Sequence, residues 1–383
     1  MLEFVIPCLL GLESLVGDEI RKLGLSDVRV ENGRVLCRGE ARDIARLNIN
    51  LRCGARVILV LHKFRATDFE SLFQGVRAVH WEDWIPREGE FPVVGYSINS
   101  TLHSVPACQS IVKKAIVERL KRTCRVDWFE ETGALYAVDV SIHSDVVTIC
   151  LDSSGAALNK RGYRTWNGEA PLRETMAAAL ALASPWRPSQ PLYDPCCGTG
   201  TLLIEAAFIA LSRAPGLTRA FDCEKWGFMP QDEMKRLRAE AEEKFAEGRE
   251  RPIHIAGSDI DGNALELARR HIAQAGLGGR IALEKKDLRD VTPRGDMGVI
   301  LCNPPYGERL GDRRAAAAVE RQLGLLQERS SGWSLCAISG DLAFERNFGR
   351  RADKKRRFYN GRLECEFMTF LPAGSRAQKR TQR

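Results

Sequence analysis

The sequence predicts an α/β protein of two or three domains, in which an α+β part precedes a mostly parallel sheet. The chain has 383 residues, which is long for one hydrophobic core. Its content of 44% hydrophobic and 28% charged residues excludes wholly disordered, collagen-like and coiled-coil classes. Near residue 165 the pattern changes from hairpins and amphipathic helices to strands that alternate with helices.

Residues 1–53 are expected to form a small α+β unit. An apolar extended run opens it, and the helix that follows repeats its apolar residues at helical spacing until Gly24 ends it. The hairpin after this helix turns at Asn32-Gly33, the strongest short hairpin signal. The predicted strand, helix, hairpin and second helix cover 4–9, 12–24, 28–39 and 43–52.

Residues 54–160 continue in the same α+β style. The predicted strand, helix, strand, helix and closing hairpin cover 56–64, 68–79, 91–99, 110–122 and 134–155. The helix at 110–122 is amphipathic, with Lys and Arg on its outer face. None of these strands ends in a glycine-rich loop or a catalytic cluster, which favours a binding module over a second active site.

From about residue 165, strands alternate with helices, as in a parallel sheet with crossover helices. The predicted strands cover 191–197, 253–260, 281–287, 297–305 and 333–340, and the helices between them cover 201–212, 263–276 and 315–326. A final hairpin at 355–371 turns at Asn360-Gly361. The long insertion at 212–250 ends in a charged helix, which we expect to face solvent.

Charge, cysteines and the N-terminus narrow the class further. Net charge is +7, and residues 350–383 hold eleven Lys and Arg against three acids, which suits a polyanionic partner. The 12 cysteines form no C-x-x-C pair, so we expect reduced thiols and no metal site. No apolar run is long enough to span a bilayer, and the acidic N-terminus lacks a signal peptide. We therefore expect a cytoplasmic protein without a membrane partner.

The first motif with chemical content is Asp194-Pro195-Cys196-Cys197-Gly198-Thr199-Gly200, between a predicted strand and a predicted helix. Glycines there let a ligand approach the backbone, and the next helix directs its N-terminus at that ligand. A dinucleotide site would require G-x-G-x-x-G, and the third glycine is missing here. The motif therefore favours a nucleoside ligand without a pyrophosphate, such as S-adenosylmethionine.

Two acids follow the next strands of the predicted sheet. Asp259 can accept hydrogen bonds from two ribose hydroxyls, as acids at this position do in nucleotide-binding sheets. Asp261 can instead cap the helix that follows it. Asp287 can contact an adenine amino group, or it can lie on a surface turn.

The third motif, Asn303-Pro304-Pro305-Tyr306, follows the strand at 297–305. The two prolines remove backbone donors and fix the shape of the chain. The Asn side-chain oxygen and the Pro304 carbonyl can then accept both protons of an exocyclic amine, whose lone pair is thereby directed at a sulfonium methyl group. This is catalysis by positioning and electrostatics. Tyr306 can stack on a base flipped out of a nucleic acid.

In this order, the three motifs resemble those of class I S-adenosylmethionine-dependent methyltransferases that methylate amino groups. Further stretches at 159–182, 213–226 and 303–312 resemble the large-subunit ribosomal RNA guanine-N2 methyltransferase family. The N-terminal half resembles that family's ferredoxin-like segment and its THUMP domain, an RNA-binding module. The resemblance implies a ferredoxin-like segment at 1–53, a THUMP domain at 54–160, and a Rossmann-like methyltransferase domain with a mostly parallel seven-stranded sheet at 161–383. We expect the form without the second methyltransferase domain that some members carry.

The family implies a role for each matching residue. The methionine part of the cofactor would lie against Asp194, Pro195, Gly198 and Gly200. Asp259 would bind the ribose, and Asp287 would lie near the adenine. The target base would be held by Asn303, Pro304 and Tyr306, with Asn303 also next to the cofactor. The stretches 161–164 and 170–174 would lie beside the cofactor pocket.

The implied reaction is methyl transfer from S-adenosylmethionine to the N2 amine of a guanine in 23S ribosomal RNA. Three alternatives stay open: guanine N2 in tRNA, adenine N6 in DNA, and a non-catalytic RNA-binding assembly factor. Guanine N2 and adenine N6 are both exocyclic amines, so the Asn-Pro-Pro-Tyr motif does not separate them. The N-terminal module favours RNA over DNA, and the complete motifs favour an enzyme. The sequence does not define the oligomeric state.

Overall fold

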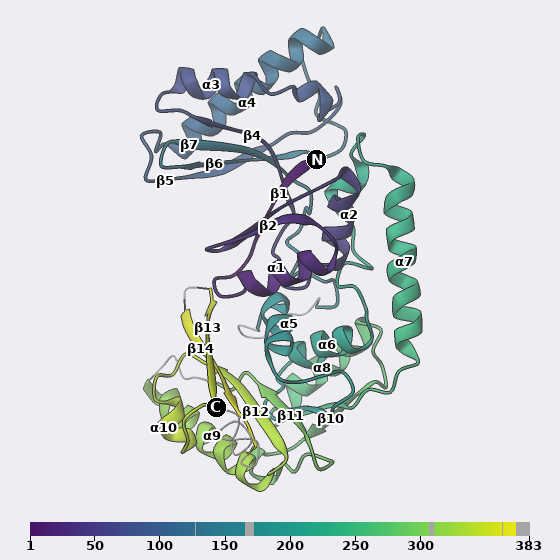
Figure 1. Cartoon of the computed structure of the whole chain (residues 1–383), viewed down its shortest axis with the longest axis vertical. Coiled ribbons are helices and arrows are strands. Elements are labelled where there is room, and N and C mark those ends of the chain that lie inside the picture. The colour runs from purple at the N-terminus through teal and green to yellow at the C-terminus, as the bar shows by residue number, and fades with distance from the viewer. Residues whose placement is uncertain (127, 165–171, 306–309, 362, 373–383) are drawn as a thin grey trace. The chain divides into compact units, whose positions relative to one another are not determined.

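The computed structural model describes residues 1–372 except 127, 165–171, 306–309 and 362 (Figure 1). The chain forms two compact units. The first contains Met1–Cys8, Val16–Leu158 and Arg219–Glu240, and the second contains Leu9–Leu15, Asn159–Thr218 and Ala241–Arg383. Each unit is built around its own seven-stranded sheet. No helix in the described part of the chain is both long and apolar enough to cross a membrane.

A single sheet runs through the first unit in the order β2-β3-β1-β4-β7-β6-β5. Its strands are β1 (Leu2–Pro7), β2 (Ser26–Glu31), β3 (Arg34–Gly39), β4 (Ile58–Arg65), β5 (Val93–Ile98), β6 (Ala137–His143) and β7 (Val146–Asp152). Among these seven described strands, only β5 and β6 pair in parallel. Because β1 pairs with both β3 and β4, the predicted segments 1–53 and 54–160 share one sheet.

The helices of this unit follow the predicted order. They are α1 (Glu13–Lys22), α2 (Ala41–Asn50), α3 (Phe69–Arg77) and α4 (Val105–Cys124). The predicted hairpins at 28–39 and 134–155 are confirmed, and each turn contains left-handed backbone of the kind that tight hairpin turns use. Gly33 has φ of 74°, and Ser144 and Asp145 have φ of 50° and 63°.

Part of the insertion after α6 belongs to the first unit. The ring of Trp226 stacks on Tyr136 at 5.4 Å, and its Nε1 donates to the Leu135 carbonyl at 2.8 Å. The N–H of Gly227 donates to the Tyr136 hydroxyl at 3.1 Å. These contacts join two parts of the sequence about ninety residues apart, so the first unit is completed by chain that follows the start of the second.

The charged helix α7 (Gln231–Arg249) is not the fully solvated face that the sequence suggested. Four apolar side chains recur along it at helical spacing, and all are buried: Met234, Leu237, Ala241 and Phe245. The guanidinium of Arg213 lies 5.0 Å from the Phe245 ring centre. The charged residues between these positions obscured a narrow apolar stripe.

The second unit holds the predicted mostly parallel sheet, in the order β10-β9-β8-β11-β12-β14-β13. Its strands are β8 (Leu192–Asp194), β9 (Ile255–Asp259), β10 (Ile281–Lys285), β11 (Gly298–Cys302), β12 (Trp333–Ser339), β13 (Lys354–Asn360) and β14 (Leu363–Phe370). The pairings from β10 to β12 are parallel, and β14 runs antiparallel to both of its neighbours. The predicted fold class is therefore confirmed.

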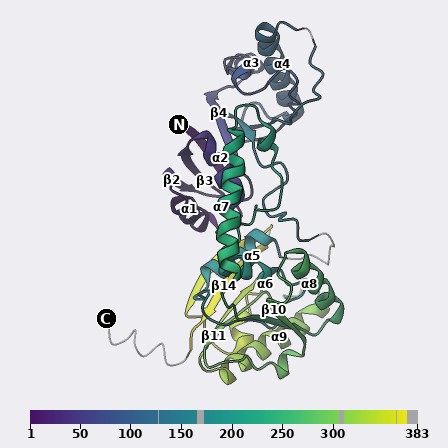
Figure 2. The ribbon, with the colours of Figure 1, turned by 90° about the vertical axis from the view of Figure 1, so that its right-hand side faces the viewer.

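Helices cover both faces of this second sheet (Figures 1 and 2). They are α5 (Glu174–Ala183), α6 (Thr201–Ala210), α8 (Gly262–Gln274), α9 (Leu310–Arg329) and α10 (Phe344–Phe348). Leu323 and Leu326 of α9 share a buried core with Ile300 of β11, Leu335 of β12 and Phe370 of β14. Strand order reverses between β8 and β11, and ligands bind at the carboxyl edge next to such a reversal.

Candidate active site

The loop after β8 depends on two glycines. Gly198 and Gly200 have φ of 50° and 81°, in the left-handed region that side chains with a Cβ avoid. Gly200 is the N-cap of α6, and a Cβ there would lie 3.2 Å from the Cβ of Ala268. The loop can therefore approach both a ligand and helix α8 closely.

Asp194 closes β8 as a buried acid, only 2% exposed. Its Oδ1 accepts a hydrogen bond from the Cys196 N–H at 3.0 Å. Burial raises the pKa of the Asp194 carboxyl to about 8; the Cys196 N–H opposes this, and the charge of Asp259 adds to it. A carboxyl held in this way fits a cationic ligand group such as an ammonium, which would compensate its charge.

Asp259, at the end of β9, ties two loops together. Its Oδ2 accepts from the Gly198 N–H at 2.7 Å, and its Oδ1 accepts from the Asp261 N–H at 3.0 Å. Each carboxylate oxygen keeps a second lone pair, so ribose hydroxyls can still be accepted. Asp261 caps α8 through the Asn263 N–H at 2.8 Å, which is the role that the sequence left open for it.

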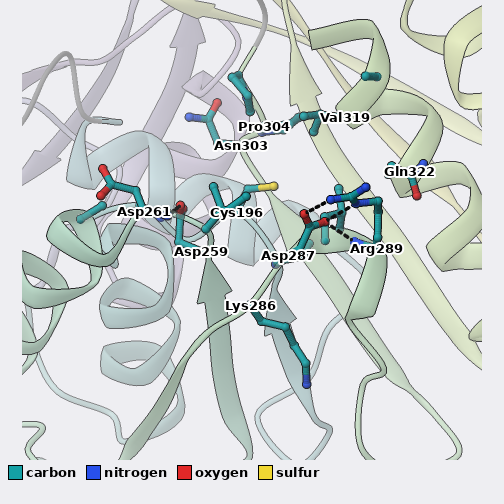
Figure 3. Close-up of a pocket in the computed structure, with 17 residues that line it drawn as sticks. Cys196, Asp259, Asp261, Lys286, Asp287, Arg289, Asn303, Pro304, Val319 and Gln322 are labelled. Atoms are coloured by element: carbon teal, nitrogen blue, oxygen red, sulfur yellow. Dashed lines mark hydrogen bonds and ion pairs between the residues drawn. The ribbon is translucent and has the colours of Figure 1, made fainter. Parts of the chain in front are cut away.

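Asp287 follows β10 and lines the same cavity, but its carboxylate is already occupied (Figure 3). Its Oδ1 accepts from the backbone N–H of Arg289 at 2.8 Å, and its Oδ2 accepts from the Arg289 Nη2 at 2.7 Å. These hydrogen bonds lower the pKa of Asp287 to about 2. Asp287 thus caps the short helix Leu288–Asp290 and remains next to the cavity. Its predicted contact with adenine stays a prediction.

Asn303 and Pro304 follow β11, across the cavity from β9 (Figure 3). The Oδ1 of Asn303 is buried and has no hydrogen-bond partner within the described residues. A buried amide oxygen without a partner is costly, and a ligand donor would relieve that cost. Tyr306 lies outside the described residues.

Two adjoining cavities occupy this edge of the sheet, of about 840 and 420 Å³. Both are lined by Cys196, Gly198, Asp261, Ala264 and Asn303, so they form lobes of one cleft. The larger lobe also includes Pro195, Asp259, Asp287 and Pro304, and the smaller one includes Asp194. Gly200 lines neither lobe. The other described residues of the predicted site thus meet around one cleft.

Several lining residues were not predicted from the sequence. Helix α9 contributes Ala318, Val319 and Gln322, one turn of a helix that the sequence marked only as a crossover. Lys286 and Arg289 line the larger lobe near Asp287. The spacing of Ala318, Val319 and Gln322 places them on one face of α9, but an alanine-rich helix gives no sign of which face meets a ligand.

The stretch 161–164 forms a buried support behind the smaller lobe. The side chains of Arg161 and Glu205 are 2% and 0% exposed and lie 3.4 Å apart, and the Tyr163 hydroxyl donates to Glu205 at 3.1 Å. Arg164 donates from Nη2 to the Thr201 hydroxyl at 2.7 Å and to the Leu172 carbonyl at 2.9 Å. Thr201 and Leu172 line the smaller lobe, so Arg164 holds its wall in place. Of the stretch 170–174, residues 170 and 171 lie outside the described residues.

No group of three His, Cys, Asp or Glu side chains in the described part of the chain could hold a metal ion.

The residues that line the cleft include acids, a buried amide oxygen without a described partner, backbone donors and apolar side chains. This combination fits an amino-acid-bearing nucleoside together with a planar amine.

Comparisons with known proteins identify the family. The RMKL-like methyltransferase domain matches residues 161–369, more than half of the chain. The chain belongs to this methyltransferase family. An RlmL ferredoxin-like domain matches 3–58, and a THUMP domain matches 66–152. The resemblance drawn from the motifs is thus confirmed, while the boundaries predicted at 53/54 and 160/161 stay predictions.

Close relatives cover nearly the whole of this RMKL-like methyltransferase. "Putative RNA methyltransferase YpsC" of Bacillus subtilis (strain 168) is 41% identical over 97% of both chains. A Listeria monocytogenes (str. 4b F2365) crystal structure, described as a "predicted N6-adenine-specific DNA methylase", is 42% identical, with a TM-score of 0.92 over 97% of this chain and 96% of that one. SMU.472, 39% identical with a TM-score of 0.93 over 97% and 98%, was crystallised with S-adenosylhomocysteine. That product agrees with the cofactor predicted from the sequence.

Proposed function

We propose that this methyltransferase transfers a methyl group from S-adenosylmethionine to the exocyclic N2 amine of a guanine in 23S ribosomal RNA. The observation that carries the proposal is the buried Oδ1 of Asn303, which has no hydrogen-bond partner among the described residues, in a residue that lines both lobes of the cleft. An acceptor of this kind suits an amine proton, and the acids beside it suit the cofactor.

Different residues around the cleft would bind different parts of the cofactor. Asp194 would bind the cofactor's ammonium, and Asp259 would bind its ribose hydroxyls. The apolar side chains of Ala264, Leu288 and Val319 would pack against the adenine. When bound, S-adenosylmethionine supplies an electrophilic methyl group and leaves as S-adenosylhomocysteine.

Asn303 would act on the nucleophile. A guanine N2 amine is a weak nucleophile because its lone pair is delocalised into the base. If Asn303 Oδ1 and the Pro304 carbonyl each accept a hydrogen bond from one amine N–H, the nitrogen is held in place. Its lone pair is then turned away from the ring and toward the cofactor. After the new N–C bond forms, one amine proton passes to solvent. Tyr306 would stack on the extruded base.

The THUMP match and the name of the Bacillus relative support RNA as the substrate. The sequence contains two basic segments, the helix at 110–122 and the stretch that begins at Arg350. In the stretch 350–357, Arg350 pairs with Asp353, Lys355 with Glu366 and Arg357 with Glu364. Three of the six Lys and Arg residues of this stretch are therefore paired with acids.

Helix α4 also carries cations suited to an RNA backbone. Its Lys113 and Arg119 pair with Glu131 and Glu82, but Lys114, Lys121 and Arg122 form no ion pair with described residues. Uncompensated cations on one helix attract phosphates and make binding dependent on salt. This supports the first unit as the RNA anchor.

The deciding experiment incubates the full chain with radiolabelled S-adenosylmethionine and total RNA from a strain that lacks the enzyme. Expected are N2-methylguanosine as the labelled nucleoside and 23S ribosomal RNA as its carrier. Genomic DNA from a strain without adenine methylation is assayed in parallel, because the Listeria relative is described as a DNA adenine methylase. Labelled N6-methyladenine in DNA would replace the proposal, label in tRNA would change its substrate, and no label anywhere would favour a non-catalytic assembly factor.

A further inference from the structure

A third cavity lies at the same edge of the second sheet as Asn303. It measures about 680 Å³ and is lined by Arg313 of α9, the turn 340–343 after β12, and Arg346 of α10, among others. Strands β11 and β12 are parallel neighbours, with Cys302 paired to Ala337. Asn303 follows Cys302 directly and the turn follows β12, so both lie beyond the carboxyl ends of adjacent strands.

Leu342 is the most exposed large apolar residue of the described chain, at 99%. It stands on a turn that hydrogen bonds fix on both sides. The Asp341 N–H donates to the Ser339 hydroxyl at 3.0 Å, and the Ala343 N–H donates to Asp341 Oδ1 at 2.7 Å. An isolated exposed leucine needs no explanation by itself. A leucine held out from a fixed turn beside a cavity is a different case.

The base of this turn is anchored in the hydrophobic core. Helix α10 follows directly, and its Phe344 and Phe348 are buried. The rings of Phe348 and Phe370 stack with centres 3.9 Å apart. Leu342 is therefore presented to solvent on a rigid support and does not lie at the tip of a loose loop.

The charges around Leu342 favour a polyanion. Arg313 and Arg346 are both exposed, and neither forms an ion pair with any residue in the described ranges. Asp341 is the only acid among the described residues that line this cavity, so the two arginines leave its lining with a net positive charge. Two guanidinium groups that line the same cavity as an apolar tip match a nucleic-acid strand, in which phosphates alternate with flat apolar bases.

We propose that Arg313, Leu342 and Arg346, which we call the Leu342 cluster, bind the RNA strand next to the target nucleotide. The two arginines hold flanking phosphates. Leu342 inserts into the base stack where the target base has left it, which lowers the cost of extruding that base. The proposal rests on the proposed function, because only an enzyme that extrudes a base leaves such a gap.

The test uses the full chain, radiolabelled S-adenosylmethionine, and total RNA from a strain lacking the enzyme. The RNA is supplied either folded or cut into short fragments, in which the target base is no longer held in a structured stack. Leu342→Ala should lower kcat/KM on folded RNA by about 10- to 100-fold, since extrusion costs a few kcal/mol. On fragments the loss should be threefold or less, and cofactor affinity by calorimetry should not change. The matched control is Leu325→Ala, which removes a different exposed leucine (49%), on α9. It should leave kcat/KM unchanged on folded RNA and on fragments.

A second pair of variants tests the arginines. Arg313→Gln with Arg346→Gln should raise the KM for RNA and lower the slope of log affinity against log salt by about two, one per lost phosphate contact. Arg294→Gln, before β11 at the opposite edge of the sheet, is the control. The role of the Leu342 cluster is overturned if Leu342→Ala has the wild-type kcat/KM on folded RNA, or if its kcat/KM falls equally on folded RNA and on fragments. Either result leaves the proposed function standing. A wild-type protein that labels no RNA overturns both.

Discussion

The carboxylate of Asp259 accepts a hydrogen bond from the backbone N–H of Gly198 at 2.7 Å. One acid at the end of β9 thereby fixes the glycine loop that follows β8, and it also faces the larger lobe of the cleft. Its loss would affect the shape of the loop and the bonds to a ribose together.

We therefore expect Asp259→Ala to weaken S-adenosylmethionine binding. Losing charge-assisted hydrogen bonds costs about 1.5–3 kcal/mol, which corresponds to roughly a 10- to 150-fold loss of affinity. Calorimetry on the full chain measures it. Asp290→Ala, at the exposed end of the short helix Leu288–Asp290, is the control. Unchanged affinity in the Asp259 variant would show that the ribose lies elsewhere.

Asn303→Ala should leave cofactor affinity nearly intact and reduce turnover on RNA. Removing one positioned hydrogen-bond partner of the reacting group typically costs about 10²–10³ in rate. Asn303→Asp keeps an acceptor oxygen at the same place and should retain more activity than the alanine variant. If the alanine variant turns over at near the wild-type rate, the Asn-Pro-Pro segment is only a structural loop.

Asp194 should make the stability of the cofactor-free protein depend on pH. Its pKa rises from 3.8 to about 8 on folding, so the folded protein keeps a proton that the unfolded chain releases. The free energy of unfolding should fall as pH rises from about 4 to about 8, because over that range the folded state binds more protons. Melting temperatures of wild type and Asp194→Asn across this range test the assignment. Parallel pH profiles for the two proteins would refute it.

The basic face of α4 should contribute to RNA affinity. Lys114→Glu with Lys121→Glu should weaken filter-binding affinity for the labelled RNA and lower the salt slope by about two. Lys235→Glu with Lys244→Glu on α7 changes net charge equally and is the control. Equal losses in both double variants would mean that only overall charge matters and that α4 is not the anchor.

Variants of the full chain are better suited to this question than removal of the first 157 residues. Trp226 lies in the part of the insertion that packs on the first unit, where its ring stacks on Tyr136. A truncated chain would keep Trp226 but lose Tyr136, which would expose a large apolar surface. Its RNA binding would then be difficult to interpret.

The order of helices and strands, and the acids and glycines of the cleft, could be read from the sequence because each depends on local signals. The period of apolar residues gives the elements, and the carboxyl ends of parallel strands must share one edge. The pairing of Asp287 with Arg289 could not be read with the same certainty, since an acid two residues before an arginine is compatible with many geometries.

Long-range pairing was the other limit. The cations at 350–357 formed a basic run in the sequence, but the pairing of β13 with β14 brings Glu364 and Glu366 into diagonal ion pairs with Arg357 and Lys355. Charge counted along a chain thus overestimates charge on a surface whenever a hairpin returns acids to the same face. On α7 the buried apolar stripe was obscured for a related reason. Its apolar residues are separated in the sequence by charged residues, which lie on other faces of the helix.

The stacking of Trp226 on Tyr136 has a consequence for biosynthesis. A ribosome releases the whole of the first seven strands before it makes the tryptophan that covers Tyr136, and β8 and α6 are synthesised in between. The first unit therefore leaves the ribosome with an apolar site still open, and closes it only when more than half of the chain has emerged. The first unit therefore reaches its final stability late, while the strands of the second sheet are being synthesised.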